Sequence, residues 1–265
     1  MQSILSSLKQ SVNIIKKNKS SVLILLIIQL LFFGILSFSA SKTLVPALTS
    51  FVDIREYMDN IDLNKVDPES PFTSGMLGDD PLMIYNNAKQ IVAYSITFII
   101  TFLLSFALIN GTSWYLTNKL INKKTKFLPY ILNFALISVI YLLLFGLILF
   151  NLSKNIVFGL SSIVYLLALI LLILLALITY FSFIALAFSD KELKQIPKKA
   201  FSLSIKKPST LITTFLISIA IKIILFTIIS FILEMNFWLL VFVLLILTFS
   251  FVFARIFFNV VVAKN

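Results

Sequence analysis

The sequence predicts an all-α, polytopic integral membrane protein with six transmembrane helices. Of its 265 residues, 60% are hydrophobic and only 12% are charged, which is about half the charged fraction of a typical soluble domain. Its mean hydropathy is +1.05. Six apolar runs are each long enough to cross ~30 Å of hydrocarbon as a helix. We place these spans, within one membrane domain covering 1–265, at 21–40, 91–117, 128–150, 156–188, 210–233 and 237–262.

A cytoplasmic, interfacial amphipathic helix is predicted over residues 1–20. Its apolar positions recur at helical spacing and are Ile4, Leu8, Val12 and Ile15. In the stretch IIKKNKSSVLI that follows, Lys16 and Lys17 are expected to contact anionic lipid headgroups while the apolar face lies on the membrane. Asn18 and Ser20 are predicted to break this helix and to cap the first span.

Residues 41–90 are predicted to form the one sizeable extracytoplasmic loop. Its eight acidic and four basic residues make it net −4. Apolar residues in its first part suggest an interfacial helix, at Leu48, Phe51, Val52, Met58 and Ile61. Asp79 and Asp80 could bind a divalent cation. Because these carboxylates are not spaced as in a defined ligand loop, we favour a solvated acidic cap instead.

Several residues near the membrane boundaries are interpreted as anchors. Trp114 and Tyr115 are expected in the aromatic belt at the inner end of the second span. The stretch LINKKTKFLPY then leads into the third span, where Pro129 is tolerated near the first helical turn. Arg255 is about two turns from the end of the sixth span, and we expect it to snorkel to the cytoplasmic surface.

The stretch SIKKPSTLI, before the fifth span, repeats the pattern of the stretch IIKKNKSSVLI before the first span. The apolar stripe of the surface helix that precedes it consists of Leu193, Ile196, Ala200 and Leu203. Lys206 and Lys207 supply charge for headgroup contacts, and Pro208 is predicted to end this helix so that Ser209 or Thr210 caps the fifth span.

The three lysine-containing stretches IIKKNKSSVLI, LINKKTKFLPY and SIKKPSTLI divide the chain into three candidate hairpin units, 1–117, 118–188 and 189–265. The alternative is that any cytoplasmic loop collects lysines without duplication. The amphipathic N-terminal stretch, the Lys-Lys-Asn turn and six spans, with KKAFSLSIKKPSTLI before the fifth, resemble the membrane domain that accompanies some bacterial glycerophosphodiester phosphodiesterases and related prokaryotic membrane proteins. The resemblance implies a stand-alone membrane module. Because the sequence carries no catalytic domain, we do not expect the hydrolase activity to carry over.

The lysines predict the orientation of the chain. They gather before the first span, between the second and third spans, and between the fourth and fifth, whereas the opposite loops carry most of the acidic residues. The positive-inside rule then places both termini in the cytoplasm, with six spans crossing the cell membrane. The net charge of +11 is interpreted as a topology signal and a contact with anionic lipid headgroups, and no nucleic-acid partner is expected.

Lys222 is the most informative polar residue within a span. It lies ~18 Å along the fifth helix from Thr210, and a polar stripe with four-residue spacing joins them through Thr214 and Ser218. Because a lysine at this depth is costly, it is expected to face the bundle interior or a wet cavity. Its candidate partners are a backbone carbonyl, Asn133, Tyr141, Gln29 or a lipid phosphate. The alternative is that this stripe, like Thr97, Thr101 and Ser105 on the second span, forms a close-packed helix interface.

The composition bounds the function. The chain has no cysteine and no histidine, which excludes disulfides, thiolate chemistry and histidine acid–base catalysis. No acidic residue lies within a span, so we expect no intramembrane hydrolase, no catalytic residue, no metal site and no cofactor. We favour a non-enzymatic accessory or scaffolding membrane module with a membrane-protein partner or a second copy of itself. The alternative is a lipid-handling or transport protein with a cytoplasm-facing polar cavity around Lys222.

Overall fold

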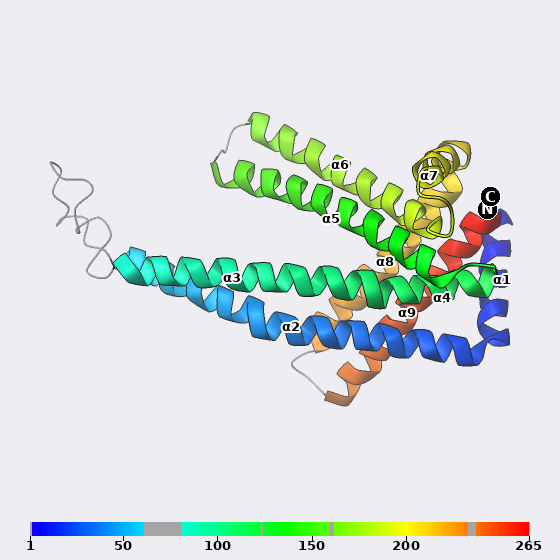
Figure 1. The fold of residues 1–265 in the computed structure, drawn as a ribbon, viewed down its shortest axis with the longest axis horizontal. Coiled ribbons are helices and arrows are strands. Elements are labelled where there is room, and N and C mark those ends of the chain that lie inside the picture. The colour runs from blue at the N-terminus through cyan, green and yellow to red at the C-terminus, as the bar shows by residue number, and fades with distance from the viewer. Residues whose placement is uncertain (1, 61–80, 123, 159–161, 233–236, 265) are drawn as a thin grey trace. The chain divides into compact units, whose positions relative to one another are not determined.

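The chain is an all-α membrane protein, and this prediction is confirmed. The computed structural model describes residues 2–60, 81–122, 124–158, 162–232 and 237–264, and every regular element within them is helical (Figure 1). Within these ranges, six helices are long and apolar enough to cross a membrane. Because such helices satisfy their own backbone hydrogen bonds in lipid, the chain is a multi-pass integral membrane protein associated with a lipid bilayer.

The helices follow the predicted spans closely in the second half of the chain and less closely in the first. Their bounds are α1 Gln2–Lys17, α2 Lys19–Asp59, α3 Pro81–Ser105, the π-helix η2 Phe106–Asn110, α4 Gly111–Ile121, α5 Phe127–Phe158, α6 Ser162–Ala187, α7 Gln195–Lys206, α8 Pro208–Ile232 and α9 Phe237–Lys264. The described chain is therefore helical over 41–59 and 81–90. The first range includes most of the predicted interfacial helix, which is continuous with the first span in α2, and the second is predicted as loop. The predicted break at 151–155 is also helical, because α5 continues past it.

Two junctions show how the sequence turns one helix into the next. The Asn18 side-chain amide donates to the Ile14 carbonyl at 2.9 Å, and the Asn18 carbonyl accepts from Val22 at 3.0 Å. Asn18 thus closes α1 and directly precedes α2, as predicted, whereas Ser20, which is also predicted to break and cap there, lies inside α2. At the second junction α7 ends at Lys206, just before Pro208, as predicted. Pro208 is itself the first residue of α8, where its missing donor is not needed, so Ser209 and Thr210 lie inside that helix and do not cap it.

The chain divides into two compact units, where the sequence predicts one membrane domain. Unit 2 comprises residues 32–105, from the later part of α2 and from α3. Its buried α2 residues include a small-residue stripe of Ser39, Thr43, Ala47 and Ser50. The Ser50 hydroxyl donates to the side-chain oxygen of Gln90 on α3 at 3.2 Å. Small side chains let two membrane helices approach closely, so this stripe is the packing surface of unit 2.

Unit 1 comprises residues 1–31 and 106–265 and is organised around α9. Half of the apolar window of α9 is buried, whereas no other span exceeds 22%. The core that α9 helps to form is largely aromatic and includes Trp114, Tyr130, Phe134, Phe183, Phe215 and, from α9 itself, Phe258. A Cβ added at Gly111 would lie 3.0 Å from a ring carbon of Phe134. That glycine therefore allows α4 to approach α5 at the end of the π-helix.

The two short helices α1 and α7 lie at the end of unit 1 where α9 ends (Figure 1). The Lys264 ammonium donates to the Ser6 hydroxyl at 3.3 Å, which links α9 to α1. In α7, three of the four predicted stripe residues are buried, and Ala200 and Leu203 belong to the aromatic core. The stripe therefore packs on protein rather than on lipid. The apolar residues that α7 exposes are Phe201 and Ile205, and those that α1 exposes are Leu5 and Leu8.

Candidate functional site: a basic cavity beside α7

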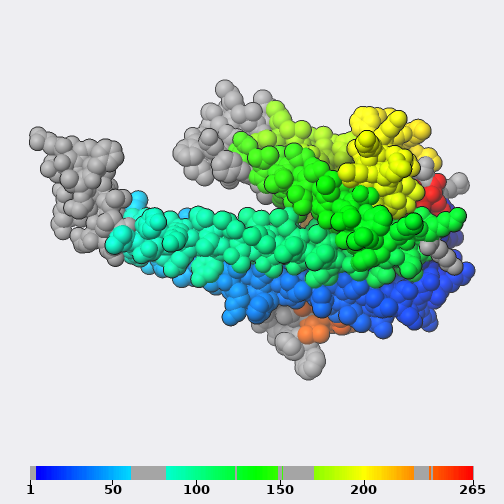
Figure 2. All heavy atoms as spheres, in the orientation of Figure 1, coloured from blue at the N-terminus to red at the C-terminus, as the bar shows by residue number. Residues whose placement is uncertain are grey.

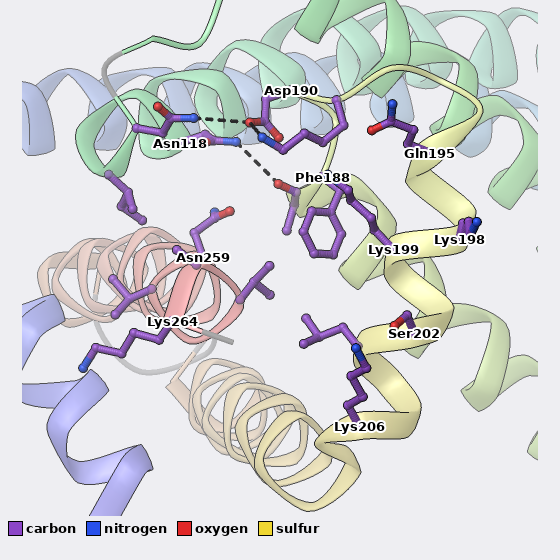
Figure 3. A pocket seen from close by; sticks show the side chains of 18 of the residues that line it. Asn118, Phe188, Asp190, Gln195, Lys198, Lys199, Ser202, Lys206, Asn259 and Lys264 are labelled. Carbon is purple, nitrogen blue, oxygen red and sulfur yellow. Dashed lines mark hydrogen bonds and ion pairs between the residues drawn. The ribbon is translucent and has the colours of Figure 1, made fainter.

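A cavity of about 1120 Å³ opens between α4, the α6–α7 turn, α7 and the end of α9 (Figure 3). Five lysines from three segments line it, against a single acidic residue, Asp190. The lysines are Lys191, Lys198, Lys199, Lys206 and Lys264. The lining thus carries a net charge of +4 in a concave surface, where charges of one sign concentrate the field. We call this site the basic cavity.

The one carboxylate in the basic cavity is already engaged. Asp190 is only 8% exposed and pairs with the Lys191 ammonium at 3.0 Å. It also accepts a hydrogen bond from the side-chain amide of Asn122 at 3.3 Å. These contacts hold the turn between α6 and α7 in place, and the ion pair neutralises the charge of Lys191. The remaining positive charge therefore has no acidic neighbour in the lining.

Buried amides form the side of the cavity opposite α7. The Asn118 side chain donates to the Ala187 carbonyl at 3.4 Å, and the Asn259 side chain donates to the Arg255 carbonyl at 3.0 Å. Figure 3 shows Asn259 pointing from α9 toward Asn118 on α4. Both side chains are under 10% exposed. This wall is polar but neutral, so the charge of the site comes from α7 and its neighbours.

Three lysines of α7 are available to a ligand. The ammonium groups of Lys198, Lys199 and Lys206 make no ion pair or hydrogen bond with any residue that the structure describes. Figure 3 shows Lys199 extending toward Phe188 and Lys198 at the other edge of the helix. Ammonium groups bind phosphate as flexible point charges. The geometry therefore fits an anionic group larger than a single ion.

The four lysines predicted to contact headgroups divide between two places. Lys206 lines the basic cavity, and Lys207 is the exposed residue that ends α7. Lys16 and Lys17 are exposed in the last turn of α1. Asp79 and Asp80, for which we favour a solvated acidic cap over a cation site, lie outside the described residues. Within the described part of the chain, no group of three or more acidic side chains could hold a metal ion.

A second polar cluster surrounds Arg255 inside the bundle. The guanidinium donates to the side-chain oxygens of Asn110 at 2.7 Å and Gln29 at 3.0 Å, and to the Ser113 hydroxyl. It also lies 5.5 Å from the ring centroid of Trp114. Arg255 is only 7% exposed. The π-helix ends at Asn110, and π-turns recur where a protein must place a particular side chain.

This cluster corrects two predictions. Arg255 does not snorkel, because buried oxygens from three other segments solvate its charge in place of water. Trp114 is 3% exposed and packs in the core rather than in a boundary belt. A signal for this cluster was present in the sequence. The polar residues Asn110, Ser113 and Thr117 share one face of the second span at helical spacing, although only the fold supplies the arginine.

The middle of the Lys222 stripe is buried, and its hydroxyls bond within their own helix. Thr214 and Ser218 are buried. The Thr214 hydroxyl donates to the Thr210 carbonyl at 2.7 Å, and that of Ser218 to the Thr214 carbonyl at 2.9 Å. These hydroxyls are therefore satisfied within α8 and offer no donor to a ligand. The hydroxyls of Thr97 and Thr101 likewise bond within α3.

Lys222 itself contacts aromatic rings. Its ammonium lies 4.4 Å from the ring centroid of Phe251 and 5.6 Å from that of Phe183. It makes no hydrogen bond within the described part of the chain. The side chains expected to pair with it are engaged elsewhere: Asn133 with the carbonyls of Ser189 and Lys191, Tyr141 with Thr179, and Gln29 with Arg255. Cation–π contacts of this kind stabilise a desolvated ammonium without a counter-ion.

Sequence reasoning missed most of the basic cavity. Its polar residues come from five segments that only the fold brings together, and those not singled out as site residues include Asn118, Asn122, Asp190, Lys198, Lys199 and Asn259. The one indication of this site in the sequence was the high density of lysines between the fourth and fifth spans, in and around α7. Comparisons with protein-family models, curated proteins and solved structures returned no match. The fold and the site therefore define this chain as a multi-pass integral membrane protein with a basic cavity.

Proposed function

We propose that this membrane protein binds a phosphate-bearing anionic group in the basic cavity and that it is not an enzyme. One observation carries the proposal. Lys198, Lys199 and Lys206 have no ion-pair partner in the described residues, while the only acidic residue of the lining is paired with Lys191. A cavity with this excess of positive charge favours a ligand that carries at least one full negative charge.

The membrane surface is the natural source of such a group. The helices α1 and α7 expose apolar residues at the end of unit 1, and lysines lie beside them. The positive-inside distribution of lysines supports placing this end at the cytoplasmic surface of the cell membrane. Anionic lipids concentrate there, and each nearby lysine contributes about 1 kcal/mol to binding them. A free phosphate ester in the cytoplasm has the same chemistry.

The site supports binding rather than catalysis. Its lining offers ammonium groups, amides, the Ser202 hydroxyl and one engaged carboxylate, and the chain has no histidine or cysteine to act as base or nucleophile. An accessory role, in which the protein holds a lipid or a phosphate ester for a partner, remains consistent with this site. It is also consistent with the resemblance to the membrane domain of phosphodiesterases. If the protein handles lipid, we place its lipid-binding site in the basic cavity rather than around Lys222.

The test compares two triple variants of the full chain. K198Q/K199Q/K206Q removes the three unpaired cavity lysines, and K119Q/K124Q/K126Q removes three lysines outside the lining. Native mass spectrometry from nanodiscs with phosphatidylglycerol and phosphatidylcholine measures retained anionic lipid. We expect the cavity variant to lose retention about a hundredfold, at about 1 kcal/mol per lysine. We expect the control to keep most of it.

A second measurement separates the two sources of the anion. Inorganic phosphate should raise the melting temperature of the detergent-solubilised protein if the cavity also takes a free phosphate, because a ligand that binds only the folded state stabilises it. This shift should disappear in K198Q/K199Q/K206Q. Equal lipid loss in both triple variants would show that total charge, and not the cavity, controls binding. That result would overturn the proposal.

A further inference from the structure

A second, apolar groove runs along the other face of α7. It has a volume of about 860 Å³ and lies between α5, α6 and α7. Its walls include Leu136, Ile140 and Leu144 from α5 and Phe181 from α6, with Phe201 from α7. The α5 part of this wall, from Leu136 to Leu144, extends for about 12 Å along the helix. We call this site the apolar groove.

The helix α7 separates the apolar groove from the basic cavity. Ile196, Pro197 and Phe201 line the groove, whereas Lys199 and Ser202 line the cavity. Lys198 is the residue common to both linings. Figure 2 shows α7 in yellow lying against the green α5 and α6. Among the described residues, the Lys198 ammonium is therefore the one charged group in the lining of the apolar groove.

The few polar atoms along the groove do not alter its character. Of the two described hydroxyl residues in the lining, Tyr141 and Ser182, Tyr141 shares a hydrogen bond at 3.3 Å with Thr179, which lies outside the lining and also donates to the Leu175 carbonyl at 2.7 Å. The Phe181 and Phe201 rings are stacked, with centroids 6.3 Å apart, and hold α7 against α6. The groove is thus an apolar channel closed on one side by α7 and charged at Lys198.

We propose that the ligand of the basic cavity is a membrane phospholipid whose acyl chain lies in the apolar groove and whose phosphate contacts Lys198. This inference rests on the proposed function and names its ligand class. The occupant must be apolar along α5 and α6 and anionic at α7, and an anionic phospholipid has both properties in one molecule. A transmembrane helix of a partner or second copy would match the groove but would leave Lys198 without an anion.

The first test fills the groove without touching the lysines. Ser182→Phe adds a ring to the α6 wall of the groove, and Leu177→Phe places a ring on an exposed α6 position outside its lining. We expect Ser182→Phe to lower phosphatidylglycerol retention about tenfold, which corresponds to losing the burial of about two methylene groups. Leu177→Phe should retain lipid as the unsubstituted protein does.

Inorganic phosphate distinguishes this inference from the proposed function. It has no acyl chain, so its thermal stabilisation should be the same in Ser182→Phe as in the unsubstituted protein. If Ser182→Phe retains phosphatidylglycerol while K198Q/K199Q/K206Q loses it, the cavity binds anions but the groove does not hold the chain. That result would overturn the inference and leave the proposed function intact.

The second test needs no substitution. Phosphatidylglycerol with a photoreactive diazirine in its acyl chain should label peptides from α5 and α6 that include Leu136, Ile140 and Phe181. Labelling spread equally over exposed α8 positions such as Ile223 and Phe226 would indicate ordinary annular lipid and would overturn the inference. A stable dimer that dissociates in Ser182→Phe would identify a second copy as the occupant, with the same consequence.

Discussion

The guanidinium of Arg255 on α9 donates to the side-chain oxygen of Asn110 at 2.7 Å, at the residue where the π-helix gives way to α4. This contact joins two spans through a charge that has no carboxylate partner among the described residues. Three neutral side-chain oxygens accept hydrogen bonds from the guanidinium, and such contacts allow a cation to be buried inside a membrane helix bundle. The cluster couples the first, second and sixth spans.

The Arg255 cluster should therefore control stability. Asn110→Ala removes one acceptor from a buried charge, and we expect the free energy of unfolding to fall by about 1–3 kcal/mol. Arg255→Met should also destabilise, because it leaves three buried oxygens without their donor. The double variant should lose less than the sum of the two. Denaturation in detergent gives this coupling, and strictly additive losses would show that the two side chains act independently.

Lys222 should be dispensable for lipid binding. Lys222→Met removes a desolvation cost and gives up a cation–π contact of about 0.5–2 kcal/mol, so the melting temperature should stay equal or rise. Phosphatidylglycerol retention should not change, since the stripe hydroxyls bond within α8. The companion Ser218→Leu should disturb packing only. Loss of bound anionic lipid in both variants would instead restore the hypothesis of a cavity around Lys222.

Gly111 should be needed for the approach of α4 to α5. Gly111→Ala places a methyl group about 3.0 Å from the Phe134 ring, and overpacking of this kind costs about 1–3 kcal/mol. Gly146→Ala is the matched control, since its Cβ would meet nothing within 4 Å. That change should stabilise by about 0.5–1 kcal/mol through helix propensity. Equal melting temperatures for the two variants would contradict the close packing.

The predicted orientation can be tested on this cysteine-free chain. Glu56→Cys, Lys126→Cys and Lys194→Cys each place one thiol at an exposed position. An impermeant maleimide added to intact cells should label position 56 alone, and permeabilisation should expose the other two. The reason is the positive-inside distribution of lysines. Labelling at 126 or 194 before permeabilisation would reverse the orientation and remove the basic cavity from the cytoplasmic surface.

The sequence by itself determined the class of protein, because the cost of burying polar backbone in lipid acts on each apolar run separately. Local chemistry also predicted the junctions, as the Asn18 side chain shows by bonding one turn back. The length of α2 was not predicted, since the first span was placed at 21–40 and the helix continues through Pro46 to Asp59. Membrane helices tolerate proline when other groups satisfy the freed carbonyl.

Only the tertiary structure decided what the polar residues do. Arg255 bonds to residues 142, 145 and 226 positions away, and no local pattern contains such pairings. The basic cavity likewise needs α4, α7 and α9 to converge before its lysines share one space. Lys222 and Arg255 are both cations within apolar spans in the sequence. In the fold Lys222 contacts aromatic rings, whereas Arg255 is hydrogen-bonded to three side-chain oxygens. The difference arises because packing brings partners together by position in space rather than by position along the chain.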